Sequence, residues 1–453
     1  MPFDAPAAIL AASVTHNRGD NTLFTPQQLF DEFGSSADVL AHAPFLERAR
    51  VEREHGREYP ARLALGAYVV ARLVDRLLSG LEGVEAQEGF AWQAAAVRRH
   101  LADLPSDSPE TAHLRGIADA VPADPMPTPA LRLCLTAYAY FLEHEARLDE
   151  ALDILGLASR AHGAAVPPAE FAAIALFAGR LNRLLARWPA ANTCYQRAED
   201  AAASAGDMVT VFRSRLGRSG VLRGQGNLPL SCAVAEEVAQ RAGSASLHEV
   251  EAMAWADVGA VLELQGRLEE SVQAKYRAFR LTEDSLNRMR VLGDLGVSLL
   301  QVKAYASARL AFEIVASSDT SFIVRTNAVL ELMDLESAAG NRMAFERRRS
   351  EAEGSRERMP PSMAADFVYK AGVGMARFGR VKRAREFLSS GLKLAEEHRL
   401  NVWYFKFERE LVSLEALEAT EVREPELATP TSFESPVVEE VAVGLREYAL
   451  SAS

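Results

Sequence analysis

The chain has 453 residues, of which 49% are hydrophobic and 25% charged, and its formal net charge is -12 at pH 7. This composition is typical of a folded globular protein and argues against disorder over most of the length. The acidic balance argues against a nucleic-acid binder that relies on neutralising phosphates, although it leaves room for a local basic surface. Three cysteines, Cys134, Cys194 and Cys232, form no C-x-x-C pair, so we expect reduced thiols and a cytoplasmic protein.

Residues 1–125 are predicted to form an N-terminal helical segment. Apolar residues at helical spacing predict three helices in it, over 61–81, 88–104 and 108–121. The longest apolar stretch is interrupted by Arg72 and Asp75, so we expect no membrane span. Four prolines within 121–129 must interrupt the helices and predict a boundary. The segment is either a separate cap or a set of degenerate copies of the unit that follows.

Residues 130–418 repeat one unit, in which an apolar helix, a short turn and a second apolar helix follow one another. Spacings of 40, 40, 40, 37, 37 and 39 residues separate seven copies, aligned on the first small residue of the second helix: Ala151, Ala191, Ser231, Ser271, Ala308, Phe345 and Ala384. One such helix pair cannot bury its apolar face by itself. The period therefore predicts an all-α solenoid of stacked helix pairs with a C-terminal capping helix.

The units resemble the tetratricopeptide repeat. The fourth copy matches best: with Ser271 at position 20, the residues at positions 4, 7, 8, 11 and 27 are Trp255, Val258, Gly259, Leu262 and Ala278. Small residues are expected at positions 8 and 20 because the two helices cross there at close range. The copies depart from the pattern in their longer period, in lacking the usual proline, and in carrying Phe345 at a small position. A HEAT-like or armadillo-like array is the alternative.

The resemblance implies a right-handed superhelix whose concave groove is lined by the first helix of each pair, at positions 2, 5, 9, 12 and 13. On this interpretation the candidate partner-binding residues are Arg180, Arg183, Arg213, Arg223, Met253, Ala256, Leu264 and Arg290. The arginines would pair with carboxylates or phosphates of an acidic peptide, beside an apolar strip. The alternative is that they are solvated or pair with neighbouring Glu and Asp side chains.

No catalytic signature is present: the chain lacks a Walker-type loop, an H-E-x-x-H motif and a G-x-S-x-G motif. We therefore predict no catalytic residue, cofactor or metal, and interpret the pair Gly372 and Gly374 as close helix packing. The predicted function is a non-enzymatic scaffold or regulatory adaptor that binds a protein or peptide in the groove. The alternatives are a peptide- or ligand-responsive sensor of a bacterial signalling or transcription system and, less favoured, an enzyme with its active site in the N-terminal segment.

Residues 419–453 form a predicted acidic tail that ends in a short amphipathic helix. Between residues 421 and 440 it has six glutamates and a single basic residue, Arg423. We hypothesise that this tail folds back on the basic part of the array as a pseudo-ligand, until a partner displaces it.

Overall fold

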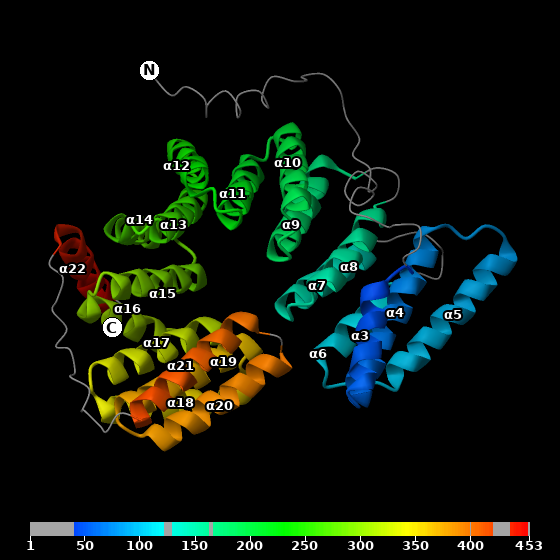
Figure 1. Cartoon of the computed structure of the whole chain (residues 1–453). Helices are drawn as coiled ribbons and strands as arrows, with labels where there is room; N and C mark the ends of the chain where they lie inside the picture. The colour runs from blue at the N-terminus through cyan, green and yellow to red at the C-terminus, as the bar shows by residue number, and fades with distance from the viewer. Residues whose placement is uncertain (1–39, 122–128, 163–165, 399, 420–434, 452–453) are drawn as a thin grey trace. The chain divides into compact units, whose positions relative to one another are not determined.

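The computed structural model describes residues 40–121, 129–162, 166–398, 400–419 and 435–451 (Figure 1). Over these ranges the regular elements are α-helices and one short 3-10 helix, Arg356–Arg358. The chain divides into two compact units, residues 1–225 and 226–453, and each is described by itself. None of the helices in the described ranges is long and apolar enough to cross a bilayer.

The first unit contains nine described helices, and each packs on its neighbours in the chain. They are α3 (Ala43–Glu54), α4 (Glu58–Leu78), α5 (Val84–Ala102), α6 (Pro109–Ala120), α7 (Pro129–His144), α8 (Leu148–Arg160), α9 (Pro168–Leu184), α10 (Trp188–Ala205) and α11 (Met208–Gly224). The three helices predicted in the N-terminal segment are present as α4, α5 and α6. Of the predicted proline-rich boundary, residues 122–128 lie outside the described residues.

The second unit contains eleven described helices. They are α12 (Leu228–Ser244), α13 (His248–Leu264), α14 (Leu268–Leu281), α15 (Ser285–Gln301), α16 (Tyr305–Ser317), α17 (Phe322–Ala338), α18 (Arg342–Glu353), α19 (Pro361–Arg377), α20 (Val381–Glu397), α21 (Asn401–Ala419) and α22 (Pro436–Ser451). Helices α13 to α20 alternate as first and second helices of four pairs, and α21 packs on the last pair. The protein is therefore an all-α array of tetratricopeptide-like helix pairs.

The turn inside each pair has one recurring conformation. A left-handed residue lies five positions before the aligned residue in all seven copies: Ala146, Ala186, Gly226, Gly266, Lys303, Gly340 and Gly379, with φ between 55° and 81°. In the fourth copy the amide of Arg267 donates to the carbonyl of Leu262 at 2.9 Å, which satisfies an end carbonyl of the first helix. The same turn joins α3 to α4, where Gly56 has φ 70°.

Small residues at positions 8 and 20 allow the two helices of a pair to cross closely, as predicted. The Ser271 hydroxyl donates to the carbonyl oxygen of Gly259 at 2.8 Å. A Cβ added to Gly259 would lie 2.6 Å from Lys275 Cγ, and one added to Gly372 would lie 2.8 Å from Leu388. The interpretation of Gly372 as a packing residue is confirmed, because no larger residue fits there without a shift.

The sixth copy tolerates Phe345 because the next pair supplies room. Phe345 is fully buried. A Cβ added to Gly374 of α19 would lie 2.6 Å from Cζ of the Phe345 ring. The large residue of one pair thus fills the space left by a missing side chain of its neighbour.

The described end of the tail, α22, packs on α14 and α16 (Figure 1). Its buried side chains are apolar: Val438, Val441 and Leu445. Residues 420–434, which carry most of the predicted acidic charge, lie outside the described residues. The pseudo-ligand hypothesis therefore stays a prediction, and the part of the tail that is described contacts second helices rather than the predicted groove.

Candidate functional site

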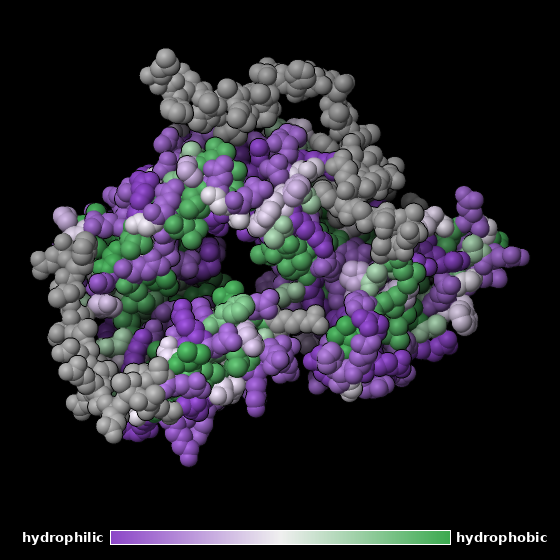
Figure 2. Space-filling view, viewed as in Figure 1, coloured by the Kyte–Doolittle hydropathy of each residue, from purple (hydrophilic) through white to green (hydrophobic). Residues whose placement is uncertain are grey.

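In the first unit, the predicted groove face contains an aromatic stack that holds one of the candidate arginines. The rings of Tyr140 on α7 and Phe177 on α9 are 4.3 Å apart with an interplanar angle of 13°. The guanidinium carbon of Arg180 lies 4.9 Å from the Phe177 centroid, and its Nη2 donates to Glu143 Oε2 at 2.5 Å. Arg180 is thus fixed by a cation–π contact and an ion pair. Figure 2 shows apolar surface over α9 on the viewed face.

Arg183 lies one turn further along α9 and has a different environment. Its Nε donates to the hydroxyl of Tyr195 at 3.4 Å. A Cβ added to Gly220 of α11 would lie 3.2 Å from Arg183 Cδ, so the missing side chain leaves room for the arginine to cross that helix. Burial raises the pKa of Tyr195, which keeps this hydroxyl neutral. Within the described residues, no carboxylate lies at ion-pair distance from Arg183.

The other two predicted arginines of the first unit, Arg213 and Arg223, differ in how accessible they are to a ligand. Arg213 is exposed and has no carboxylate at ion-pair distance in the described part of the chain, although its charge, after the hydrogen bond from Thr210, contributes to the lowered pKa of Asp207. Arg223 is half-buried and already has a contact within the protein. Of the four arginines predicted in this unit, Arg183 and Arg213 are therefore the two that a ligand carboxylate can reach without displacing an internal acid.

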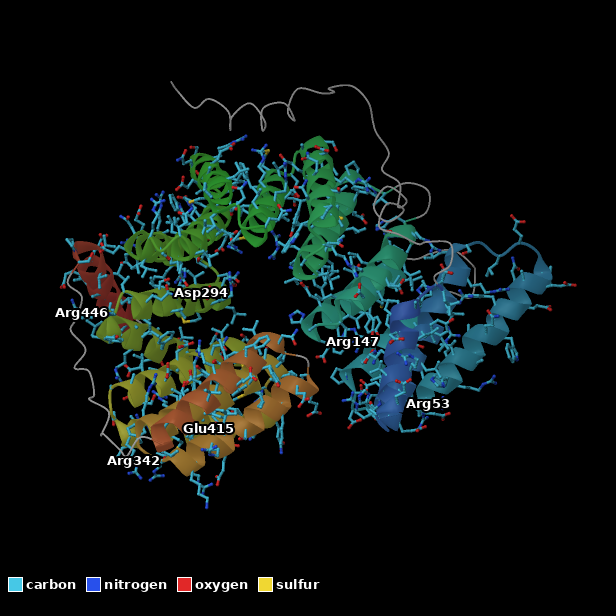
Figure 3. The ribbon with its side chains drawn as sticks, in the orientation of Figure 1. Arg53, Arg147, Asp294, Arg342, Glu415 and Arg446 are labelled. Carbon is cyan, nitrogen blue, oxygen red and sulfur yellow. The ribbon has the colours of Figure 1, made fainter. Side chains whose placement is uncertain are left out.

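In the second unit the predicted apolar strip is shorter than expected. Met253 and Leu264 on α13 are exposed at 38% and 61%, as a binding strip requires. Ala256 is half-buried and packs on the hydrophobic core of the unit. Arg290 on α15 lies 3.9 Å from Asp294 Oδ2, an exposed neighbour one turn away (Figure 3).

A network of polar side chains lies beside this strip, and none of its residues was predicted as a binding residue. Lys275 Nζ on α14 donates to Glu263 Oε2 at 2.5 Å and to Ser298 Oγ at 2.7 Å. Burial alone would raise the pKa of Glu263, but the hydrogen bond and charge of Lys275 and the hydroxyl of Ser298 lower it overall. Glu263 stands at position 12, so the repeat register already placed it on the groove face.

A buried cluster of charged side chains joins the N-terminal segment to the first helix pair of the array. Glu110 Oε2 accepts from Arg147 Nη1 at 2.7 Å, and Glu110 Oε1 accepts from the Tyr138 hydroxyl at 2.7 Å and from Arg48 Nη2 at 3.0 Å. Figure 3 labels Arg147, which stands just before α8 and also pairs with Glu150. These contacts join α3, α6, α7 and α8. Each acid in the cluster faces an arginine, so removing one partner would leave a buried charge uncompensated.

A metal centre has no candidate in the part of the chain that the structure describes. Among those residues, no group of three or more His, Cys, Asp or Glu side chains is placed to hold a metal ion.

Comparison with known proteins shows a likeness in fold alone. No family model matches the chain, and no curated protein matches it significantly. One similar solved structure is the Rap conjugation gene regulator of the plasmid pLS20 in complex with the Phr* peptide: identity is 12%, coverage 85% of this chain and 97% of that chain, and the TM-score 0.46.

Two further structures are similar at the same level. A Rap protein complexed with competence and sporulation factor is 10% identical, with coverage of 79% of this chain and 98% of that one and a TM-score of 0.40. Aspartyl phosphate phosphatase F from Bacillus subtilis is 10% identical, and the match covers 82% of this chain and 97% of that one with a TM-score of 0.41.

Proposed function

We propose that this chain is a non-enzymatic regulatory protein that binds a protein or acidic peptide segment on the face formed by the first helices α7, α9 and α11 of its first unit. The observation that supports the proposal is the state of Arg183 and Arg213, neither of which has a carboxylate at ion-pair distance among the described residues. Arginine presents a planar set of donors that suits a carboxylate.

The neighbouring aromatic stack indicates what else the ligand contains. Tyr140 is 43% exposed, and its ring edge and the outer surface of α9 offer an apolar contact next to the arginines. An aromatic or large aliphatic side chain would pack there. The ligand chemistry that fits is therefore an Asp or Glu placed a few residues from an apolar side chain.

We also propose a division of the chain into three segments and a cytoplasmic location. We divide it into the N-terminal segment 1–125, the array 130–418 and the acidic tail 419–453. Because α3 and α4 are joined by the turn found inside the repeats, we infer that the N-terminal segment contains a degenerate pair. The three cysteines carry free thiols, which favours a reducing compartment such as the cytoplasm.

A peptide-display selection tests the proposed function. Peptides selected on the wild-type chain should be enriched in Asp or Glu close to an apolar residue. Arg183→Glu combined with Arg213→Glu should then weaken their binding at least ~10-fold, about 1.4 kcal/mol. The matched control is the double reversal Arg53→Glu and Arg76→Glu, two exposed arginines of the same unit that the proposal does not use.

Two outcomes separate the alternatives. Peptides without acidic enrichment, or equal affinities for the groove and control variants, would reject the acidic-peptide surface. Small-angle scattering then distinguishes an adaptor from a sensor, since only a sensor changes its solution shape when the selected peptide binds.

A further inference from the structure

Helix α22 contacts the array through one face. Val438, Val441 and Leu445 are buried at spacings of three and four residues, which places them on one side of the helix. One turn later Tyr448 meets Phe279 of α14 edge-on, with ring centroids 5.1 Å apart. Arg446, on another face, is exposed and lies 3.8 Å from Glu439 of the same helix. The helix is therefore amphipathic, and its apolar side rests on α14 and α16.

The surface that receives α22 differs from the same surface of every other repeat. Tyr276 lies five residues after the aligned residue of the fourth copy, and the other six copies have polar residues or glycine there: Gly156, Gln196, Glu236, Glu313, Ser350 and Ser389. Phe279 is likewise the single aromatic residue at its position, where the other copies have Ser159, Glu199, Ala239, Ala316, Glu353 and Leu392. Packing between pairs does not require this aromatic pair, since α8 packs on α9 and α16 packs on α17 without it.

The fit between helix and surface depends on a glycine. A Cβ added to Gly444 of α22 would lie 2.8 Å from Tyr276 Cζ and closer still to the tyrosine hydroxyl oxygen. Ser435, just before the helix, donates from its hydroxyl to Glu269 Oε2 at 2.8 Å. The surface thus recognises a helix that combines an apolar stripe with a notch opposite Tyr276.

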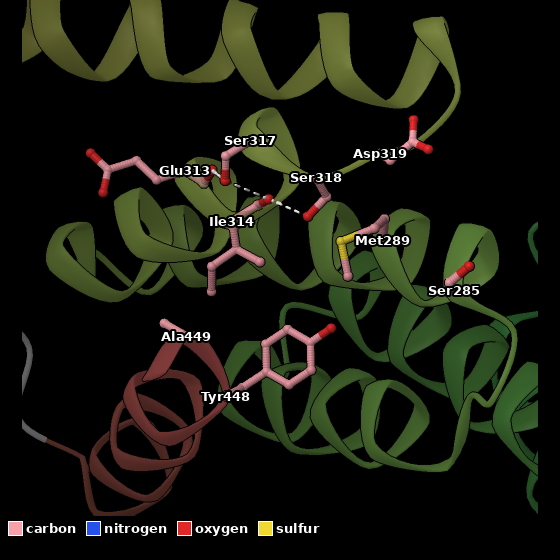
Figure 4. Close-up of a pocket in the computed structure, with 9 residues that line it drawn as sticks. All are labelled: Ser285, Met289, Glu313, Ile314, Ser317, Ser318, Asp319, Tyr448 and Ala449. Atoms are coloured by element: carbon pink, nitrogen blue, oxygen red, sulfur yellow. Dashed lines mark hydrogen bonds between the residues drawn. The ribbon is translucent and has the colours of Figure 1, made fainter. Parts of the chain in front are cut away.

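This surface extends beyond the end of α22. A pocket of about 550 Å³ lies beside Tyr448 and Ala449, and its other walls come from α15, α16 and the residues after α16, among them Met289 and Ile314 (Figure 4). Glu313 lines its rim and has no cationic partner among the described residues. Helix α22 offers no basic residue after Tyr448. A helix with a Lys or Arg at that point would fit the acidic rim better than α22 does.

We propose that the α14–α16 surface is a binding site for an amphipathic helix of a partner protein, and that α22 is its built-in competitor. The partner helix has the Val–Val–Leu–Tyr pattern of α22, a glycine opposite Tyr276, and a basic residue that reaches Glu313. Because the competitor is tethered, its effective concentration is high, and the partner gains the site when its basic residue adds a contact that α22 lacks. The proposal does not depend on the groove arginines.

Binding of labelled peptides to the full-length chain tests this proposal. The probes are the peptide 436–451 and the same peptide with Ala449→Arg. The chain variant Gly444→Ala expels α22 by a clash with Tyr276, although alanine is the better helix former. Leu445→Asp expels α22 in a different way, because it places a charge in the buried apolar contact. Gly293→Ala is the matched control, because a Cβ there meets nothing within 4 Å.

We expect both release variants to bind the peptide at least tenfold more tightly than the wild type and Gly293→Ala do. The Ala449→Arg peptide should bind more tightly again, with a stronger dependence on salt. Adding Tyr276→Ser, the residue that two other copies have, should remove the gain. Trypsin should cleave faster after Arg446 in the release variants alone.

The inference is overturned if neither release variant takes up peptide, if Tyr276→Ser has no effect, or if the Ala449→Arg peptide binds no better than the native one. A dimer that exchanges α22, seen by light scattering and lost on Leu445→Asp, would make a second copy the occupant and would also reject the partner helix. Charge reversal at Arg183 and Arg213 should leave peptide binding unchanged, so this proposal and the proposed function fail separately.

Discussion

At the scale of single residues, the array depends on positions where a side chain is missing. Gly259 and Gly372 let paired helices cross, and Gly374 accommodates the ring of Phe345 from the neighbouring pair. Because interiors are close-packed, a methyl group at such a position has to displace its neighbour. These glycines therefore serve packing, since none of the three has a positive φ.

Gly374→Ala tests this dependence. Overpacking against Phe345 should lower the free energy of unfolding by about 1–3 kcal/mol. Phe345→Leu in the same chain should restore part of the loss, because it removes the atoms that the new methyl group meets. Urea denaturation measures both effects. The control Gly293→Ala should be neutral or stabilising, and equal losses in the two glycine variants would contradict the steric explanation.

At the scale of elements, helices α3 and α6 of the N-terminal segment meet the first pair of the array, α7 and α8, at Glu110. Burial alone would raise the pKa of this carboxyl, but the hydrogen bond from Arg147, the charges of Arg48 and Arg147, and the Tyr138 hydroxyl lower it overall. Glu150 pairs with the same two arginines, but there burial outweighs them and raises the pKa of the carboxyl. The pKa values of the two acids are thus shifted in opposite directions.

Acid should selectively weaken the contribution of Glu110. A carboxyl whose folded pKa is depressed stabilises the protein above its unfolded pKa of about 4.3, and this contribution is lost as the pH falls through the folded pKa. Glu110→Gln should cost roughly 3 kcal/mol near neutral pH, since it leaves buried arginines without their partner. The difference from wild type should shrink as the pH falls below the unfolded pKa and through the lowered folded pKa of Glu110. Denaturant titrations across this range measure it, and Glu85→Gln, at an exposed acid, serves as the control.

At the scale of the whole molecule, stability should be distributed along the array. In a repeat protein each pair contacts its neighbours, so the free energy is approximately a sum of pair and interface terms. A local defect is therefore expected to loosen the pairs around it and to leave distant pairs protected.

Hydrogen exchange followed by mass spectrometry tests this distribution. Gly374→Ala should raise exchange in α17 to α20 and leave α7 to α10 unchanged. Gly217→Ala should do the reverse, because a Cβ there would lie 2.6 Å from Tyr195 Cδ1 in the first unit. A uniform rise over the whole chain in either variant would show that it unfolds as a single cooperative body.

The amino-acid sequence by itself determined the repeat register of this protein. Helical periodicity is local, so the aligned residues Ala151 to Ala384 could be assigned before any contact was known. The same register predicted a short turn inside every pair and the close crossing at Gly259. Each of these features depends on residues within one helix pair, which is why the sequence reveals them.

The tertiary structure alone decided which charges are free and where the last helix binds. Arg180 is occupied by Glu143 of the preceding pair, whereas Arg183 is held over Gly220 without an acid. Helix α22 lies outside the repeat period, and it packs on Tyr276, far away in the sequence. Periodicity shows which face of a helix is buried. The partners of individual side chains on that face depend on residues from other pairs, which only the folded chain brings together.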